Sequence, residues 1–469
     1  MVTTVRINVS LSCLWFLLIY GIAGAQQSPI QEKYRIDLSD PTDRVLIAKF
    51  SPDDSKILFV NQKSTQIWSA QTGKLLVTFP EPMRVDYGFE ISWQPGGSKI
   101  LQHYADSLRK RPAVLWDGET GQRLATLEEE AGVIGAEWNS EGDRILSVGN
   151  YVGSSWVNDF TFSVRDENGR VIRSERHKQY GFHAITLSAT GDKVIVSQEP
   201  RRNGKPIEVF DRDSGRLLQG FDHDLPKLNS LLYPIFVGES PDGKYLCGEI
   251  DGSKGIVCWR SADGKPIYYF LDTKETGDNV FLSFSGDSQR LAILRSRQKK
   301  IDIADAATGR VQFSIAGMKT VYQASVAAMN RSFLPGFEYS DLWSPDGNEF
   351  VATDVENQVS LWNLNSGQMI SKRPAIWNSD YDWFVGDLPT DYEIFKFNPR
   401  RKLLLSVSNQ VVRIWDPVNG ELLKEIVFPY TKKGDNVRER YVATWSPDGE
   451  LLTTAANNNR TLIVWTVEK

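Results

Sequence analysis

Short runs of alternating apolar and polar residues repeat along the chain, and turn residues separate them. Alternation with a period of two is typical of β-strands that bury one face. Residues 339–371 show the pattern well, with runs at Tyr339–Trp343, Glu349–Thr353, Val359–Trp362 and Gln368–Ser371. The sequence therefore predicts four short strands in this unit, joined by tight turns.

Two turn signals mark each unit. The first is a turn of the Ser-Pro-Asp-Gly type, in which Pro fixes φ and Gly accepts a positive φ. It recurs every 43 to 59 residues, with clear copies starting at Ser51, Ser240, Ser344 and Ser446 and weaker copies at Gln94, Asn139, Ser188, Ser285 and Asn398. The second is an apolar run that ends near a bulky aromatic residue and leads into a Gly turn, as in Leu115–Gly121.

A fixed period near 45 residues with four strands per unit is typical of a β-propeller. We predict an all-β fold: a single propeller of about nine four-stranded blades that spans residues 33–469. Known propellers mostly have about four to eight blades, so eight blades plus an accessory unit, or two smaller rings, are alternatives. No linker rich in Gly, Pro or Ser divides the repeats, which counts against two domains.

The two ends of the chain are predicted to complete one blade. Residues 33–38 form an extra strand pattern before the first full unit, and the last unit stops after its third strand at Leu462–Trp465. We predict that Tyr34–Leu38 pairs with Leu462–Trp465. This pairing would close the ring and leave no open blade at the end.

Several of the aromatic-ended runs carry a Trp-Asp pair, at Trp116-Asp117 and Trp415-Asp416. Related tryptophans stand at Trp68, Trp259, Trp362 and Trp465. Over about residues 33–469 these repeats resemble the WD40 family, although the Gly-His pair of that family is absent because none of the four His follows a Gly. The Ser-Pro-Asp-Gly turns resemble those of exported bacterial propellers of the TolB type. Both resemblances imply a rigid ring that binds other molecules on its faces.

The N-terminus has the pattern of a signal peptide. Arg6 supplies a positive charge, Leu11–Ala23 is an apolar run of 13 residues, and Ala23-Gly24-Ala25 fits a cleavage site. The run is shorter than the roughly 20 residues that span a bilayer. We expect residues 1–25 to be removed, residues 26–32 to form a linker, and the chain to be exported to the periplasm or outside the cell, with no membrane span after cleavage.

Two cysteines remain in the predicted mature chain, Cys247 and Cys258. They flank the turn Asp251–Lys254, and a symmetric hairpin would place them directly opposite each other. Directly opposed residues have Cα atoms about 4.5 to 5.5 Å apart, which suits a disulfide. An even number of cysteines in an exported chain favours this bond, and two buried thiols are the alternative.

No catalytic motif is present. The chain lacks a nucleophile elbow, a P-loop, a dinucleotide-binding glycine motif and any His or Cys pair with metal-ligand spacing. Its net charge is −5 and it has no basic stripe, which argues against nucleic-acid binding. The Asp-rich turns need no metal to explain them, because Asp side chains hydrogen-bond to the backbone of tight turns. We expect no metal, no cofactor and no enzymatic activity, with an enzyme that uses a central-channel site as a less favoured alternative.

We expect the functional residues to lie in the segments that depart from the repeated pattern. The longest is Arg373–Thr390, which holds the candidate partner-binding residues Trp377, Asp380, Tyr381, Asp382, Trp383 and Phe384. Exposed aromatics beside carboxylates are typical of binding hot spots, and a loop folded onto its own aromatics is the alternative. The same face is expected to carry three basic segments, Ala105–Pro112, Glu199–Pro206 and Tyr430–Arg440. Two further breaks are an aromatic loop at Gly149–Asp159 and an insertion at Gly317–Pro335.

The sequence thus favours a non-enzymatic exported propeller that binds a protein or peptide through this loop face. A carbohydrate-binding or cell-envelope-binding module that uses Trp377, Tyr381 and Trp383 is the alternative. The identity of the partner cannot be predicted from these residues.

Overall fold

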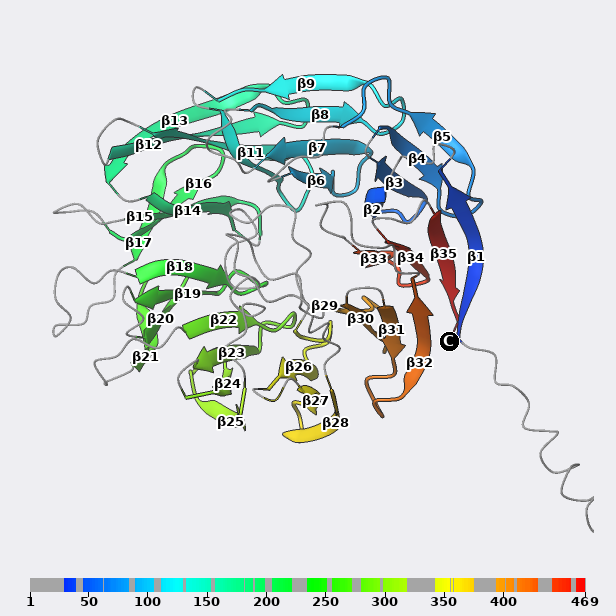
Figure 1. The fold of residues 1–469 in the computed structure, drawn as a ribbon. Helices are drawn as coiled ribbons and strands as arrows, with labels where there is room; N and C mark the ends of the chain where they lie inside the picture. The colour runs from blue at the N-terminus through cyan, green and yellow to red at the C-terminus, as the bar shows by residue number, and fades with distance from the viewer. Residues whose placement is uncertain are drawn as a thin grey trace, which may run out of the picture.

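A computed structural model gives the fold of the chain. It describes residues 29–38, 45–61, 63–83, 89–104, 111–129, 132–152, 157–180, 182–188, 190–198, 205–221, 234–250, 255–271, 280–295, 298–318, 342–354, 356, 358–374, 394–400, 402–408, 411–428, 441–456 and 461–468. All regular elements in these ranges are strands, and they form nine sheets arranged as one ring (Figure 1). The single ring confirms the predicted nine-bladed propeller. The predicted signal peptide lies outside the described residues.

Blades are numbered here in chain order, and each antiparallel sheet is given from its inner to its outer strand. Blades 1 to 3 are β2 Val45–Phe50, β3 Lys56–Asn61, β4 Thr65–Ser69, β5 Leu75–Thr78; β6 Phe89–Trp93, β7 Lys99–Tyr104, β8 Ala113–Asp117, β9 Arg123–Leu127; and β10 Val133–Trp138, β11 Arg144–Val152, β12 Val157–Asp166, β13 Val171–Tyr180. Blades 4 to 6 are β14 Phe182–Leu187, β15 Lys193–Gln198, β16 Ile207–Asp211, β17 Leu217–Phe221; β18 Pro234–Glu239, β19 Tyr245–Ile250, β20 Gly255–Arg260, β21 Pro266–Leu271; and β22 Val280–Phe284, β23 Arg290–Arg295, β24 Lys300–Asp305, β25 Val311–Ala316. Blades 7 to 9 are β26 Glu349–Thr353, β27 Gln358–Asn363, β28 Gln368–Pro374; β29 Ile394–Phe397, β30 Leu404–Ser408, β31 Val411–Trp415, β32 Leu422–Val427; and β33 Tyr441–Trp445, β34 Leu451–Ala456, β35 Thr461–Val467, β1 Ile30–Asp37.

Eight sheets have four strands in the described residues. Blade 7 has three, and an isolated bridge joins Trp343 to Phe350 at the place predicted for its first strand. The predicted strand over Glu349–Thr353 is confirmed as β26.

Blade 9 is built from both ends of the chain. Strand β1 pairs antiparallel with β35, and Tyr34 lies opposite Val464 while Ile36 lies opposite Leu462. This is the predicted closure. The strand begins at Ile30, however, so residues 30–32 belong to the propeller rather than to the predicted linker. Ile30 is fully buried and adds to the contact that closes the ring.

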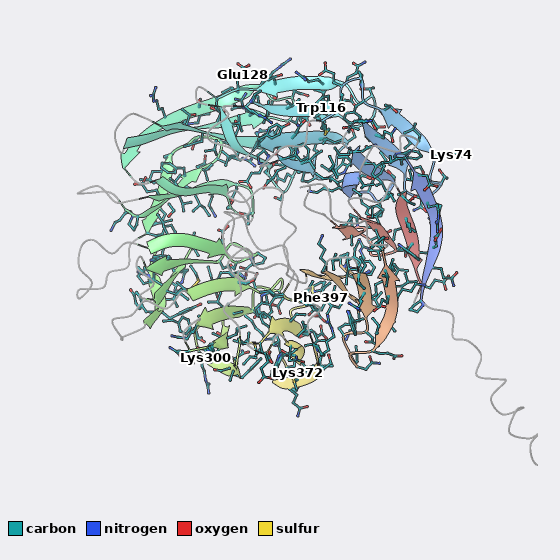
Figure 2. All side chains as sticks on the ribbon, in the orientation of Figure 1. Lys74, Trp116, Glu128, Lys300, Lys372 and Phe397 are labelled. Carbon is teal, nitrogen blue, oxygen red and sulfur yellow. A yellow bond between two sulfur atoms is a disulfide. The ribbon has the colours of Figure 1, made fainter. Side chains whose placement is uncertain are left out.

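Apolar side chains between neighbouring blades form the core. Leu101 and Leu115 of blade 2 pack with Val133 and Ile145 of blade 3, and the same arrangement recurs around the ring. Charged side chains such as Lys74 and Lys372 lie at the outer rim (Figure 2). Each blade therefore buries its faces against its neighbours, which lets a chain of this length fold without one central core.

Blade 3 corrects the sequence prediction. The expected aromatic loop over Gly149–Asp159 is mostly strand, because β11 continues to Val152 and β12 begins at Val157, and Tyr151 lies opposite Asp159. Tyr151 and Val152 are of residue types that favour strands, in agreement with the extension of β11 through them. Trp156 lies outside the described residues.

Candidate binding faces

The turns between first and second strands lie on one face, together with those between third and fourth strands; we call it the turn face. In all nine first turns, the leading residue donates its backbone N–H to the carbonyl five residues later. The leading residues are Ser51, Gln94, Asn139, Ser188, Ser240, Ser285, Ser344, Asn398 and Ser446. Their side-chain oxygens accept backbone N–H groups of the same turn, for example Lys56 to Ser51 at 2.9 Å and Arg144 to Asn139 at 3.0 Å. The weaker copies of the signal therefore form similar turns: Ser188 and Ser285 use their hydroxyls, and in Gln94, Asn139 and Asn398 an amide oxygen replaces the hydroxyl.

Carboxylates in these turns are used by the turns themselves. Ser51 donates its hydroxyl to Asp53 at 2.5 Å, and Ser240 donates to Asp242 at 2.7 Å. Burial raises the pKa of Asp53, but hydrogen bonds from Ser51 and Ser55 together outweigh it, so the pKa lies below its usual value. Asp53 is thus an ionised acceptor already occupied by local donors.

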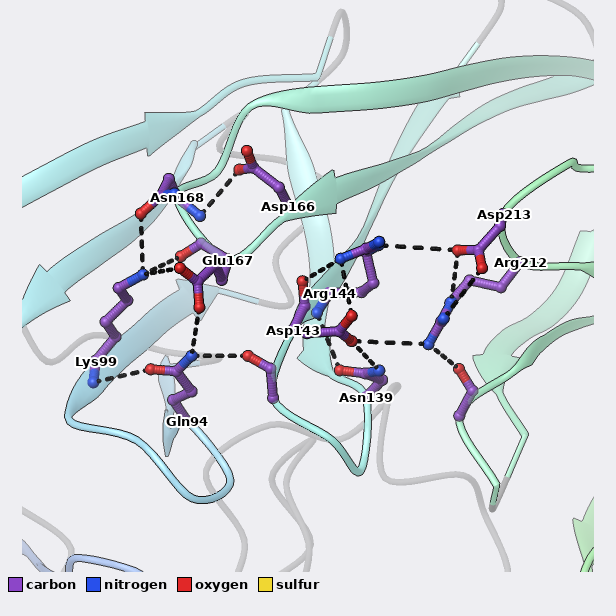
Figure 3. A network of polar contacts seen from close by, with 12 residues as sticks. Gln94, Lys99, Asn139, Asp143, Arg144, Asp166, Glu167, Asn168, Arg212 and Asp213 are labelled. Atoms are coloured by element: carbon purple, nitrogen blue, oxygen red, sulfur yellow. Dashed lines mark hydrogen bonds and ion pairs between the residues drawn. The ribbon is translucent and has the colours of Figure 1, made fainter.

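Neighbouring turns are also bonded to each other across the blade boundaries (Figure 3). Arg212 of blade 4 lies 4.0 Å from the carboxylate of Asp143 in blade 3. Gln94 of blade 2 donates to the carbonyl of Gly142 in blade 3 at 2.7 Å. Asn398 does the same to Gly449 at 2.9 Å. The described polar groups of the turn face therefore mainly hold the ring together.

The tryptophans near the ends of the third strands also have a structural role. The indole N–H of Trp116 donates to Gln102 at 2.9 Å, that of Trp415 to Ser406 at 2.9 Å and that of Trp465 to Thr454 at 2.8 Å. In each case the acceptor stands on the second strand of the same blade. The indole thus fixes the register of the sheet while its ring fills the space between blades.

Blade 3 carries an arginine, Arg165, at the tryptophan position. Its Nε donates to Ser147 at 2.9 Å, and its terminal nitrogen lies 3.0 Å from the carboxylate of Glu129. Both side chains are almost fully buried, at 6% and 4% exposure. Glu129 also accepts hydrogen bonds from Ser147 and Ser163. The sequence pattern did not reveal this ion pair, because Glu129 stands outside every repeat motif.

The face opposite the turns, here the loop face, is where the connections that break the repeat join the blades. The predicted binding residues Trp377, Asp380, Tyr381, Asp382, Trp383 and Phe384 lie outside the described residues. The start of their segment is described, and it corrects the predicted boundary: Arg373 and Pro374 belong to β28.

Arg373 is anchored against blade 8. Its guanidinium stacks over the ring of Trp415, 4.3 Å from the centroid, and lies 5.9 Å from that of Phe395. It also donates to the hydroxyl of Ser406 at 3.4 Å. The point where residues 375–393 leave β28 is therefore fixed to the neighbouring blade.

The three basic segments are only partly described. Arg111 stacks over Tyr104 at 4.6 Å, and Lys205 is exposed. Residues 105–110, 199–204 and 430–440 of these segments lie outside the described residues, as do residues 319–335 of the predicted insertion. A shallow depression at the outer edge of blade 6 is lined by Asp305, Thr308, Arg310, Val311 and Gln312. Its carboxylate, Asp305, accepts two hydrogen bonds from Thr308. The carboxylate in that depression therefore stabilises its own turn.

Cys247 and Cys258 are directly opposed on β19 and β20, as the hairpin geometry predicts. The structure joins them by a disulfide with Cα atoms 4.2 Å apart, and both residues are fully buried. The bond links the second and third strands of blade 5 inside the apolar contact with blade 6.

Within the described ranges, no group of three or more His, Cys, Asp or Glu side chains is placed to hold a metal ion. The same part of the chain contains no helix with the length and apolar character needed to cross a bilayer.

Comparison with known proteins supports the fold alone. No family model matches the sequence, and no curated protein matches it. A crystal structure of a eukaryotic initiation factor is similar with a TM-score of 0.56 and 15% identity, over 82% of this chain and 89% of that one. The C-terminal WD40 domain of Sif2 aligns over 94% of this chain and 99% of its own at 12% identity, but its TM-score of 0.48 is too low to carry an argument. The chain is thus a β-propeller by structure.

Proposed function

We propose that this chain is an exported, non-enzymatic β-propeller that binds a protein or peptide through its loop face. The observation that carries the proposal is the difference between the faces. The described carboxylates and amides of the turn face bond to their own turns or to the next blade. Binding groups are therefore expected on the opposite face, where the segments that break the repeat connect the blades.

The segment from 375 to 393 is the main candidate. It connects β28 to β29, and its 19 residues contain the aromatic and acidic cluster from Trp377 to Phe384. Aromatic side chains bury large areas at low entropic cost, and carboxylates beside them orient a partner. The stacking of Arg373 on Trp415 supports a defined starting point for this segment.

The test compares a Trp377→Ala, Trp383→Ala double variant with wild type and with Val418→Ala. Val418 is 56% exposed in a turn of blade 8, so this control removes an exposed apolar side chain from the turn face. Partners are captured by crosslinking from a cell-envelope extract, and the strongest is then purified and titrated. We expect wild type and Val418→Ala to bind it equally and the double variant to bind at least about tenfold more weakly.

Equal binding by all three proteins would contradict the proposal. A double variant with a markedly lower melting temperature would instead show that the segment packs on the ring as a cover. Titration with envelope oligosaccharides identifies the alternative carbohydrate-binding function if they bind wild type and not the double variant.

Export is tested separately. The signal sequence supports a mature chain that begins at Gln26. Intact mass measured on protein from the periplasm or medium should match residues 26–469. Retention of the full-length chain in the cytoplasm would contradict export.

A further inference from the structure

Blade 3 has an outer strand unlike those of the other blades. Strand β13 spans 10 residues, Val171–Tyr180, whereas β5 has 4, β9 and β17 have 5, and β1, the longest of the others, has 8. It is paired with β12 along this whole length, up to Tyr180 opposite Val157. The inner strand β10 pairs with β11 only as far as Gly149. The outer hairpin of blade 3 therefore extends past the end of its inner strand.

Strand β13 is the last strand of its sheet, and Figure 1 shows it at the outer edge of the ring. In an antiparallel edge strand, alternate residues direct their N–H and C=O groups away from the sheet. Its first two residues are also exposed apolar side chains, Val171 at 52% and Ile172 at 49%. The strand thus offers a backbone edge with an apolar anchor at one end.

The charge of this edge is positive although the whole chain is acidic at −5. Residues 170–180 contain four cations, Arg170, Arg173, Arg176 and Lys178, against one carboxylate, Glu175, which gives a net charge of +3 with His neutral. Glu175 forms an ion pair with Arg173 of the same strand. On the neighbouring strand β12, Asp159 lies opposite Lys178 and lowers the net charge of this edge to +2, whereas the nearby Glu167 pairs with Lys99 at 3.3 Å.

The other basic outer strand does not offer the same surface. In β28, Lys372 binds Asp354 at 2.8 Å and Arg373 stacks on Trp415. The longer β1 contains Glu32, Lys33, Arg35 and Asp37, whose charges cancel. Length and positive charge therefore coincide only in β13 among the outer strands.

We infer that the β13 edge is a second binding site, distinct from the loop face, which takes an extended acidic peptide as an added antiparallel or parallel strand. Main-chain hydrogen bonds would supply affinity in such a site, and side chains at alternate positions would supply specificity. The positive edge selects an acidic strand and opposes pairing with a second copy of β13, since like charges would then face each other.

The test uses a fluorescein-labelled peptide of ten residues in which Glu alternates with Val and Thr. Fluorescence anisotropy measures its binding to the mature chain at low and high NaCl. We expect saturable binding that weakens by about tenfold or more from 50 mM to about 500 mM NaCl, because screening shortens the reach of surface charge. The same peptide with N-methyl groups on alternate residues should not bind, because it cannot donate the main-chain hydrogen bonds.

Charge-reversal variants locate the site. Arg170→Glu with Arg176→Glu should weaken binding about tenfold or more at low salt. The matched control is Arg216→Glu with Arg310→Glu, since these exposed residues follow the turn glycines of blades 4 and 6 as Arg170 does in blade 3. The control, and also the Trp377→Ala, Trp383→Ala variant, should bind the peptide as wild type does. Equal melting temperatures show that all variants are folded.

Three results would overturn the inference. One is no binding to wild type, and another is equal binding of the N-methylated peptide, which would show charge attraction without strand addition. The third is a dimer in light scattering that Arg170→Glu with Arg176→Glu dissociates, since the occupant of the edge would then be a second copy. If residues 375–393 bind no partner, the peptide-binding measurements at the β13 edge should still give the results expected above.

Discussion

Blade 3 and blade 9 hold their sheets together in opposite ways. Blade 3 comes from one continuous stretch, Val133–Tyr180, and where most blades have an indole it has Arg165, which forms a buried ion pair with Glu129 of the connection from blade 2. Blade 9 joins both ends of the chain, and its tryptophan, Trp465, bonds to a threonine within an apolar core. The comparison teaches that different side chains at the same repeat position, an arginine in blade 3 and an indole in blade 9, can each bond to the second strand of the blade.

Removing β1 should give the largest effect, because blade 9 depends on a strand from the other end of the chain. Deletion of residues 26–38 from the mature protein removes buried Ile30, Ile36 and Leu38 and leaves β35 paired only with β34. Fully burying one such side chain contributes about 1.5–3 kcal/mol, so the loss should exceed about 5 kcal/mol in the free energy of unfolding. Urea denaturation measures it. Deletion of residues 26–28 is the control and should have little effect; unchanged stability after the longer deletion would refute the closure.

The ion pair of blade 3 gives the next largest effect. Glu129→Ala leaves the guanidinium of Arg165 buried without its carboxylate, which should cost about 3–5 kcal/mol of unfolding free energy. In blade 8, by contrast, Ser406→Ala removes one neutral acceptor from Trp415 and should cost about 1 kcal/mol. The double variant Glu129→Leu, Arg165→Trp should recover most of the loss, since it restores the tryptophan of the other blades. Additive losses in the double variant would contradict this interpretation.

Substitutions of the turn glycines that contact blades 3 and 9 should also differ in how much stability they cost. Gly73 and Gly215 both have positive φ, 66° and 58°. A Cβ at Gly73 would lie 2.7 Å from the ring of Tyr34 in β1, whereas a Cβ at Gly215 would meet the flexible end of Arg173 in β13. Gly73→Ala should therefore cost about 3 kcal/mol, from backbone strain and overpacking, and Gly215→Ala about 1–2 kcal/mol from strain alone. Thermal or urea unfolding compares the two, and equal costs would argue against a rigid contact at Tyr34.

Alkaline pH should produce the smallest change in the free energy of unfolding, through Tyr34 of blade 9. Burial raises the pKa of Tyr34 to about 12, and its hydroxyl donates to the carbonyl of Ala70 at 2.8 Å. An unfolded tyrosine ionises near pH 10. The stability from neutral Tyr34 is therefore complete below about pH 10 and is lost as the pH rises toward 12. Tyr34→Phe should be less stable than wild type at pH 8 but lose less stability between pH 10 and 12. Parallel pH profiles for the two proteins would contradict this.

Much of the fold was predictable because the repeat signals depend on local chemistry. All nine first turns form at the predicted residues, since Ser, Asn and Gln at the leading position make equivalent hydrogen bonds. The pairing of Tyr34 and Ile36 with β35 was also predictable, because an orphan strand at one end matched a missing strand at the other.

What the sequence did not reveal depends on contacts between distant residues. Glu129 becomes a partner of Arg165 only when blades 2 and 3 pack, and no motif marks it. The length of the blade 3 strands was missed because Gly149–Asp159 was predicted as a loop, whereas β11 continues to Val152 and β12 begins at Val157. The predicted cluster around Trp377 and Trp383 stays a prediction, since it lies outside the described residues.

A single crosslink tests the closed nine-bladed ring most directly. Arg35 lies opposite Ile463 in the pairing of β1 with β35, while Ile36 lies opposite Leu462. Cysteines at Arg35 and Ile463 should form an intramolecular disulfide under mild oxidation, seen by peptide mapping of the monomer. Cysteines at Arg35 and Leu462, one register step away, should crosslink poorly. Absence of the first crosslink, or its formation only between two chains, would contradict the closure on which this account depends.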